Sequence, residues 1–221
     1  MSTIHFSKIE LAPEADGSAG ALVAYLARTA KSLGDAHHLV WSLFGDRNGA
    51  RHFLYRMTGA GVRQPILLYS AEPPVDTTGL WKVETKALRL PEQAGERVAW
   101  SIRVNPVISR DGKKHDVITD ARHKGPKGER WDDTAQRVMP TWLAPRLAKI
   151  GLAVDMATVA VEGSARHEFQ HDRNRPVTVR AVDVRGTATV ENPALLAAGI
   201  LDGIGSAKIY GCGMLLVRRI G

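Results

Sequence analysis

The sequence predicts an α+β protein built from two tandem βαββαβ units, with a glycine-rich loop near its C-terminus. Segments with strand-like alternation are interleaved with segments whose apolar residues recur at helical spacing. The 221 residues suffice for two small domains, which we expect at residues 1–95 and 96–221. This order of elements is the ferredoxin-like topology, which RNA-recognition (RRM-like) modules share. Because no internal sequence repeat is visible, the duplication is inferred from the element pattern alone.

Strands and helices alternate through the first expected domain. Phe53, Tyr55 and Met57 recur at every second position, which is typical of a half-buried strand. Asp35 is placed to cap a helix over residues 36–44. The expected strands are 3–11, 50–57 and 64–70, the expected helices are 21–31 and 36–44, and residues 80–90 are ambiguous and mostly extended.

The second expected domain contains the longest helix of the chain. Asp132 and Asp133 favour the N-terminus of this helix, and Gly151 ends it. Pro140 and Pro145 should kink it. The expected strands are 97–105, which is counted in both units, 158–162, 177–190 and 214–217, and the expected helices are 132–150 and 193–201.

Composition limits the partner and the chemistry. The formal net charge of +7 favours a polyanionic partner, nucleic acid first and an anionic membrane second. The single cysteine, Cys212, excludes an internal disulfide and a multi-cysteine zinc site, and it fits a reducing cytoplasm. No apolar run approaches the length of a membrane span, and the N-terminus lacks the layout of a signal peptide. The eight histidines are not spaced like metal ligands, so we expect no metal and no cofactor.

Two basic segments interrupt the element pattern. Residues 106–130 are expected to form a long loop, which is either functional or a solvated insertion. Residues 166–175 are expected at the tip of a long hairpin, and a basic ribbon of this kind can follow phosphates along a groove. A solvated hairpin tip is the alternative. The candidate polyanion-binding side chains are Lys113, Lys114, Lys124, Lys127, Arg166, His171, Arg173 and Arg175.

The glycine-rich loop places Gly203, Gly205, Gly211 and Gly213 around Lys208. Glycines at this density mark a backbone that turns sharply or comes close to a partner. The N–H groups of such a loop can cradle a phosphate, and Lys208 adds a cation. The alternative is a tight connection without a ligand, since the spacing matches neither a P-loop nor a dinucleotide-binding fingerprint.

His37 and His38 are the candidate acid–base residues, at the expected start of a helix. A helix N-terminus offers N–H groups to an anion, and neutral imidazole is the usual proton acceptor or donor near pH 7. RNA carries its own nucleophile, the 2′-hydroxyl. Its cleavage therefore needs a base, an acid and donors for the developing charge, without a metal. The alternative is a pair of surface histidines in a capping region.

Four stretches together match one known family. They are residues 6–9 (FSKI), 37–44 (HHLVWSLF) with 51–55 (RHFLY), 103–106 (RVNP), and 203–216 (GIGSAKIYGCGMLL). The combination of the glycine-rich stretch with His-x-x-x-Trp-x-x-Phe is the most specific part. These residues resemble the CasE-type CRISPR repeat endoribonucleases of type I-E systems, in the RAMP superfamily. The resemblance extends from the first expected strand to the last.

This resemblance implies metal-independent cleavage at the 3′ base of a repeat stem-loop, which leaves a 2′,3′-cyclic phosphate and a 5′-hydroxyl. Members remain on the mature guide RNA as a subunit of Cascade, together with other Cascade subunits. The catalytic histidine of the family falls at His37. The family often has a tyrosine three residues earlier, where this chain has Gly34. Tyr25, His38 and Lys208 are therefore the candidates for the second catalytic group.

The alternative function is a non-catalytic RNA-binding subunit of a CRISPR ribonucleoprotein with the same fold. Both functions use the same basic segments, and they differ at His37. A membrane-surface protein is disfavoured, because no basic amphipathic helix with an aromatic face is present.

Overall fold

The computed structural model describes residues 3–12, 20–22, 25–26, 33–44, 51–59, 64–171 and 175–221. The chain divides into two compact units. The first unit takes Met1–Arg89 and two later segments, His167–Val177 and Ile209–Gly211, and the second unit takes the remainder. The domain boundary expected between residues 95 and 96 stays a prediction.

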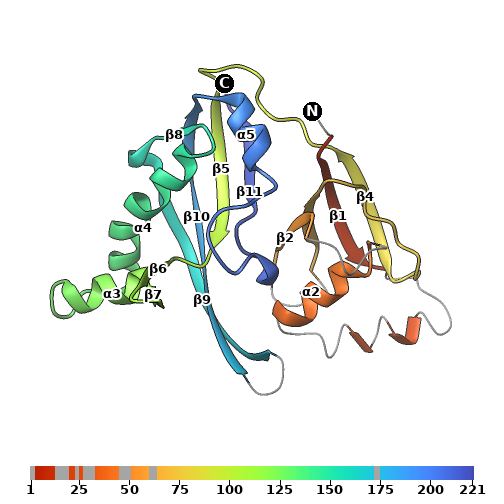
Figure 1. Cartoon of the computed structure of the whole chain (residues 1–221), viewed down its shortest axis with the longest axis horizontal. Coiled ribbons are helices and arrows are strands. Elements are labelled where there is room, and N and C mark those ends of the chain that lie inside the picture. Colours follow the sequence, from red (N-terminus) through yellow and green to blue (C-terminus); the bar gives the residue numbers. More distant parts are fainter. Residues whose placement is uncertain are drawn as a thin grey trace. The chain divides into compact units, whose positions relative to one another are not determined.

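The sheet of the first unit contains β1 (His5–Leu11), β2 (Phe53–Met57), β3 (Ile66–Ser70) and β4 (Trp81–Ala87). All neighbours in this sheet are antiparallel, in the order β2-β3-β1-β4 (Figure 1). The ambiguous residues 80–90 contain β4, which pairs with the full length of β1. The strand at 97–105 belongs to the second sheet alone, so its expected sharing between the units is wrong.

Helix α2 (Leu33–Trp41) packs on β2 of this sheet. Ala36, Val40 and Leu43 are buried at the spacing of one helical face. The expectation that Asp35 caps a helix starting at residue 36 is wrong, because Asp35 lies inside the helix in its first turn. Of the expected helix 21–31, residues 21–22 and 25–26 are helical and the others lie outside the described residues.

The connection from β3 to β4, residues 71–80, contains no helix. Here the Asp76 carboxylate accepts hydrogen bonds from the backbone N–H groups of Thr78 at 2.9 Å and Trp81 at 3.0 Å. A short polar turn therefore replaces the second crossover helix that the βαββαβ pattern predicts for the first unit.

The second sheet contains β5 (Arg97–Val104), β8 (Leu152–Val154), β9 (Ala160–His171), β10 (Arg175–Val190) and β11 (Leu215–Arg219). Its order is β11-β5-β10-β8, and β9 also pairs with β10. The first strand, β5, lies between the last strand, β11, and β10, and β1 likewise lies between the last strand, β4, and β3 in the first sheet. Helices α4 (Trp131–Ala148) and α5 (Pro193–Gly199) pack on this sheet, with Ile102 and Leu147 fully buried in the core (Figure 1).

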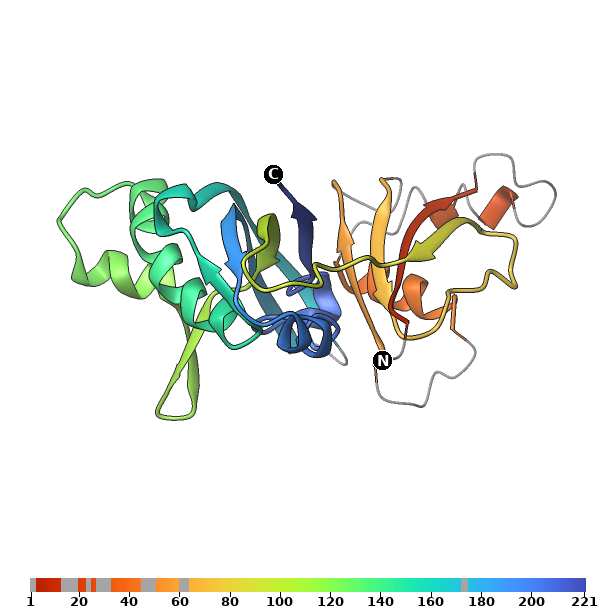
Figure 2. The same ribbon diagram turned by 90° about the horizontal axis from the view of Figure 1, so that it is seen from above.

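Residues 106–130 were expected to be a loop, and the structure corrects this. They form a two-stranded ribbon, β6 (Val107–Arg110) and β7 (Lys113–Asp116), followed by α3 (Val117–Lys124). Asp116 caps α3, accepting from the N–H of Thr119 at 2.7 Å, and Ile118 anchors the helix with no exposed surface. Figure 2 shows this ribbon, in yellow-green, projecting from the rest of its unit. The sequence misleads because most side chains of the ribbon are polar and exposed, and Val107 and Ile108 leave no alternating apolar pattern.

Two more expectations about the second unit are corrected. The strand expected at 158–162 starts two residues later, as β9 at Ala160, and continues to His171; a 3-10 turn over Met156–Thr158 precedes it. The short strand β8 was not predicted at all. The sequence of β9 from Glu162 to Arg166 shows no apolar alternation, because its side chains there are exposed. Pro140 and Pro145 lie inside α4 without ending it, and the expected kink stays a prediction.

Among the described residues, no helix combines the length and the apolar character that crossing a membrane requires. Within the same part of the chain, no group of three or more His, Cys, Asp or Glu side chains could hold a metal ion.

Candidate active site

His37 lies in the middle of α2, beside the buried face of the helix. Its ring is partly exposed, whereas the ring of His38 is exposed, and the two ring centroids are 5.8 Å apart. Because α2 spans Leu33–Trp41, these histidines lie in the middle of the helix and not at its N-terminus as the sequence suggested. The site therefore depends on side chains and not on the backbone N–H groups of a helix start.

Trp41 contacts His37 from one helical turn further along α2. The indole Nε1 donates a hydrogen bond to Nε2 of His37 at 3.1 Å. Indole is a donor only, so Nε2 accepts and carries no proton in this arrangement. The other ring nitrogen, Nδ1, is buried. The lone pair of Nε2 is thus present and directed at Trp41.

Two aromatic residues of β2 lie below the imidazole. Phe53 and Tyr55 are two positions apart on the strand, so both face α2. Their ring centroids are 6.3 Å and 6.4 Å from that of His37, and the Tyr55 ring is inclined by only 25° to the imidazole. Both are 1% exposed, so these rings belong to the buried core.

Tyr55 is itself held by the end of the glycine-rich loop. Its hydroxyl donates to the carbonyl oxygen of Ile209 at 2.8 Å. Gly211 has a φ of +77°, and a Cβ added there would lie 3.2 Å from Cε2 of Tyr55. The same short segment contacts β9, because the rings of Tyr210 and Phe169 make a T-shaped contact with centroids 4.8 Å apart. Segment Ile209–Gly211 therefore contacts both Tyr55, which lies beside His37, and β9, which contains part of the basic segment 166–175.

All four loop glycines adopt positive φ, which explains their density. At Gly213 the fit is tightest, because a Cβ would lie 2.8 Å from the carbonyl oxygen of Ile204. The N–H of Gly213 donates to the carbonyl oxygen of Arg103 at 2.7 Å, which ties the loop to β5. These contacts account for the glycines structurally. The phosphate contacts expected of Gly203, Gly205, Gly211 and Lys208 stay predictions.

The ribbon β6–β7 and α3 present basic side chains in the second unit. Lys113 and Lys114 are exposed on β7, and Lys127 is exposed after α3. Lys124 instead binds Asp120 at 2.9 Å, beside a bidentate contact from Arg110 at 2.6 and 2.8 Å. Hydrogen bonds from Arg110 and then Lys124 hold the pKa of the Asp120 carboxyl well below its usual range. Arg110 therefore fastens β6 to α3, whereas the pair of Lys124 with Asp120 lies within α3.

The remaining predicted residues are placed only in part. Arg166 is exposed on β9, and Tyr25 is 53% exposed on a helical segment. His171 and Arg175 lie in β9 and β10, and Arg173 lies outside the described residues.

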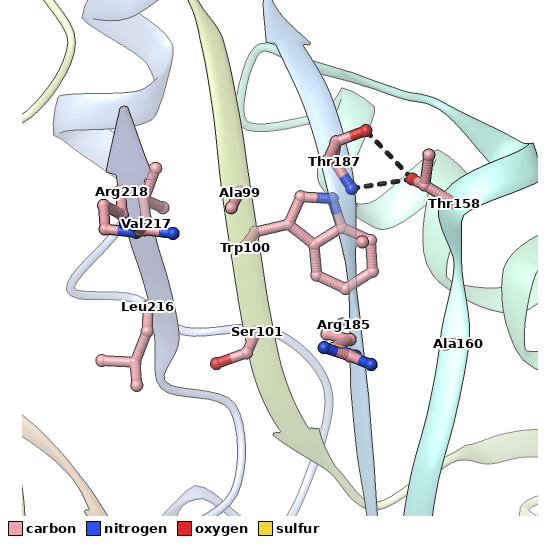
Figure 3. Close-up of a pocket in the computed structure, with 11 residues that line it drawn as sticks. Ala99, Trp100, Ser101, Thr158, Ala160, Arg185, Thr187, Leu216, Val217 and Arg218 are labelled. Atoms are coloured by element: carbon pink, nitrogen blue, oxygen red, sulfur yellow. Dashed lines mark hydrogen bonds between the residues drawn. The ribbon is translucent and has the colours of Figure 1, made fainter. Parts of the chain in front are cut away.

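A hollow of about 450 Å³ lies over β11, β5 and β10 in the second unit (Figure 3). Ser101 and Leu216 line it, and Arg185 and Arg218 supply its charge. Arg185 is paired with Glu162 at 3.0 Å. The lining contains no histidine, tyrosine or carboxylate, so the hollow could hold an anion but offers no proton transfer near neutral pH. The site at His37 is the better candidate for chemistry.

The two sheets, with the same strand order and the same antiparallel pairing, define a double ferredoxin-like fold of the α+β class. The sequence model of the family described as "CRISPR associated protein" matches residues 4–219. The chain belongs to this family.

Similar proteins agree with this assignment. CasE, a Cascade subunit of the CRISPR system of Escherichia coli (strain K12), is 25% identical over 194 residues, or 84% of this chain and 91% of that protein. Thermus thermophilus Cse3, solved with an RNA representing a pre-cleavage complex, has a TM-score of 0.70 at 20% identity, covering 98% and 99% of the two chains. Cas6e from E. coli K-12 has a TM-score of 0.58 at 22% identity, covering 98% and 100%. The predicted fold class is confirmed.

Trp41 and Tyr55 are the site neighbours that sequence reasoning missed. The spacing of four between His37 and Trp41 places two side chains on one helical face, and it could have indicated their contact. No comparable signal exists for Tyr55, whose contact with Ile209 joins residues 154 positions apart.

Proposed function

We propose that the protein is an endoribonuclease that cleaves CRISPR precursor RNA at the base of the repeat stem-loop. It then stays on the mature guide RNA as a Cascade subunit, in contact with other Cascade subunits. The observation that carries this proposal is the His37 imidazole, partly exposed and held with an unprotonated nitrogen. Support comes from the relative described as a Cascade subunit and from the fold of an endoribonuclease described in complex with RNA.

The reaction uses the 2′-hydroxyl of the RNA as the nucleophile. The bond from the 2′-oxygen to phosphorus forms while the bond from phosphorus to the 5′-oxygen breaks. A base removes the proton of the 2′-hydroxyl, and the leaving 5′-oxygen gains a proton from an acid. The products are a 2′,3′-cyclic phosphate and a 5′-hydroxyl, and no metal takes part.

His37 is the proposed acid–base residue on the scissile phosphate. The second group is one of His38, Tyr25 and Lys208. His38 has the simplest geometry of the three, because its ring is exposed and 5.8 Å from that of His37. Exposed lysines such as Lys113 and Lys114 hold the RNA, and cations near the phosphate offset the charge that develops in the transition state.

A cleavage assay on a synthetic repeat tests this function. We expect one cut at the 3′ base of the stem, an undiminished rate in EDTA, and no cut when the scissile nucleotide carries a 2′-deoxyribose. Cleavage that stops in EDTA, or that persists with the 2′-deoxy repeat, would exclude the proposed chemistry.

One observation favours the non-catalytic alternative. Gly34 stands where the family often has a tyrosine, so a second catalytic group is not evident at that position. In that case the protein binds the repeat tightly and leaves it intact, and the same assay separates the two functions. The cytoplasmic location that the single cysteine favours stays a prediction under either function.

A further inference from the structure

We infer that Trp41 is a positioning residue that selects the tautomer of the neutral His37 ring. Its indole favours the tautomer with the proton on Nδ1 and the lone pair on Nε2. The effect of this tautomer on catalysis rests on the proposed function, whereas the tautomer itself does not. The hydrogen bond itself is a property of the protein before RNA binds.

The hydrogen-bond chemistry of the two rings leads to this form. A neutral imidazole has one N–H donor and one acceptor nitrogen, and the neighbour decides which is which. Trp41 Nε1 has only a proton to give, and it lies 3.1 Å from Nε2 of His37. A proton on Nε2 would set two donors against each other. The indole therefore assigns the proton of the neutral ring to Nδ1.

Packing keeps Trp41 and His37 in this arrangement. The Trp41 and Phe53 rings make a T-shaped contact, with centroids 4.9 Å apart and planes at 78°. The ring of Tyr55 lies 6.4 Å from that of His37 with planes inclined by 25°, while the planes of Trp41 and His37 meet at 84°. The hydrogen bond from Trp41 orients the imidazole between these rings.

This arrangement prepares Nε2 to act as the base. A general base needs an unprotonated nitrogen, and Trp41 maintains one at the partly exposed ring of His37. The ribose hydroxyl is also a donor, so it can take the place of the indole N–H on the same lone pair. The exchange replaces one hydrogen bond by another and requires no change of tautomer.

The variant Trp41→Phe removes the N–H and keeps an aromatic ring against Phe53. The matched control is Trp81→Phe, because Trp81 Nε1 donates to Ser42 Oγ at 3.2 Å in the same unit and does not bond to His37. Two readouts are needed: the tautomer of His37 by long-range ¹H–¹⁵N NMR without RNA, and the single-turnover cleavage rate with the repeat.

We expect the wild type and Trp81→Phe to show Nε2 as the unprotonated nitrogen, and Trp41→Phe to lose this preference. The single-turnover rate should fall about 3- to 10-fold in Trp41→Phe, the size of one hydrogen bond, with an unchanged Kd for the repeat.

Wild-type protein that shows the proton on Nε2 overturns the inference, even if the variant does not fold. The inference also fails if Trp41→Phe keeps both the tautomer and the full rate. Wild-type protein that shows the expected tautomer but does not cleave the repeat contradicts the proposed function and leaves the tautomer assignment supported.

Discussion

The two units share one strand order but carry different side chains on it. The first unit places His37 on α2 over the aromatic residues of β2, and its second crossover is a short turn. The second unit keeps helix α5 in that crossover and adds the ribbon β6–β7 with α3. The first unit has the group that could transfer protons, whereas the second presents exposed lysines on an added element. Changes in the first should alter the cleavage rate, and changes in the second should alter RNA affinity.

The largest expected effect is that of His37→Ala in the first unit. Removing a general acid or base typically costs about 10²–10⁴-fold in rate. We expect a loss of this size in the single-turnover cleavage of the repeat, with the Kd within about 2-fold of wild type, since one neutral imidazole adds little to RNA affinity. His38→Ala is measured in parallel, because His38 is a candidate for the second catalytic group and should also slow cleavage if it has that role. A larger loss of cleavage rate in His38→Ala than in His37→Ala would assign the main catalytic role to His38 and contradict its assignment to His37.

Gly211→Ala should have the next largest effect. Its Cβ would lie 3.2 Å from Cε2 of Tyr55, at a φ of +77° that costs an L-residue about 1–2 kcal/mol. Gly79→Ala is matched, because its φ is +72° and nothing lies within 4 Å of the added Cβ. We expect both to lower the free energy of unfolding, and only Gly211→Ala to slow cleavage. If Gly211→Ala and Gly79→Ala cleave the repeat at equal rates, the contact between Gly211 and Tyr55 does not contribute to the function of His37.

The double variant Lys113→Ala, Lys114→Ala tests the second unit. Each lost phosphate contact should reduce the slope of log K against log salt by about 0.7–0.9, so two contacts reduce it by about 1.4–1.8. Lys82→Ala is the control, since Lys82 is paired with Glu84 at 3.2 Å in the first unit. The rate at saturating protein should not change. A salt slope equal to that of wild type would place the RNA elsewhere.

The smallest effect concerns the attachment of the ribbon to α3. Arg110 and Lys124 lower the pKa of Asp120, so the carboxylate form stabilises the folded ribbon above the usual carboxyl pKa of about 4. This stabilisation is lost as the pH falls below about 4. The hydrogen-exchange protection factors of residues 107–124, which correct for the slower intrinsic exchange at acid pH, should therefore fall below about pH 4 in the wild type and depend less on pH in Asp120→Asn. Asp133→Asn, on the exposed first turn of α4, should behave like wild type.

The sequence predicted the fold where the pattern of apolar residues reports burial directly. The strand of Phe53, Tyr55 and Met57 and the helix of Met139, Leu143 and Leu147 were found because one face of each is buried. The ribbon β6–β7 and the strand β9 were missed or shortened, because their exposed side chains leave no such pattern.

The residues of the candidate site also differ in whether local sequence reveals them. His37 and the four glycines could be named from local sequence, since each is marked by residue type and spacing. Tyr55 could not, because its role depends on Ile209 and Gly211, which come near it only in the folded chain. The start of α2 was misjudged because Asp35 is a good capping residue that here lies inside the first turn.

The most direct test of the account is a structure of the protein bound to a repeat made uncleavable by one 2′-deoxyribose at the scissile nucleotide. We predict that an imidazole nitrogen of His37 lies within about 3.2 Å of the scissile 5′-oxygen or of the position that the 2′-oxygen would occupy. A complex in which the ring remains on Trp41 while the scissile phosphate lies beside other side chains would contradict the account.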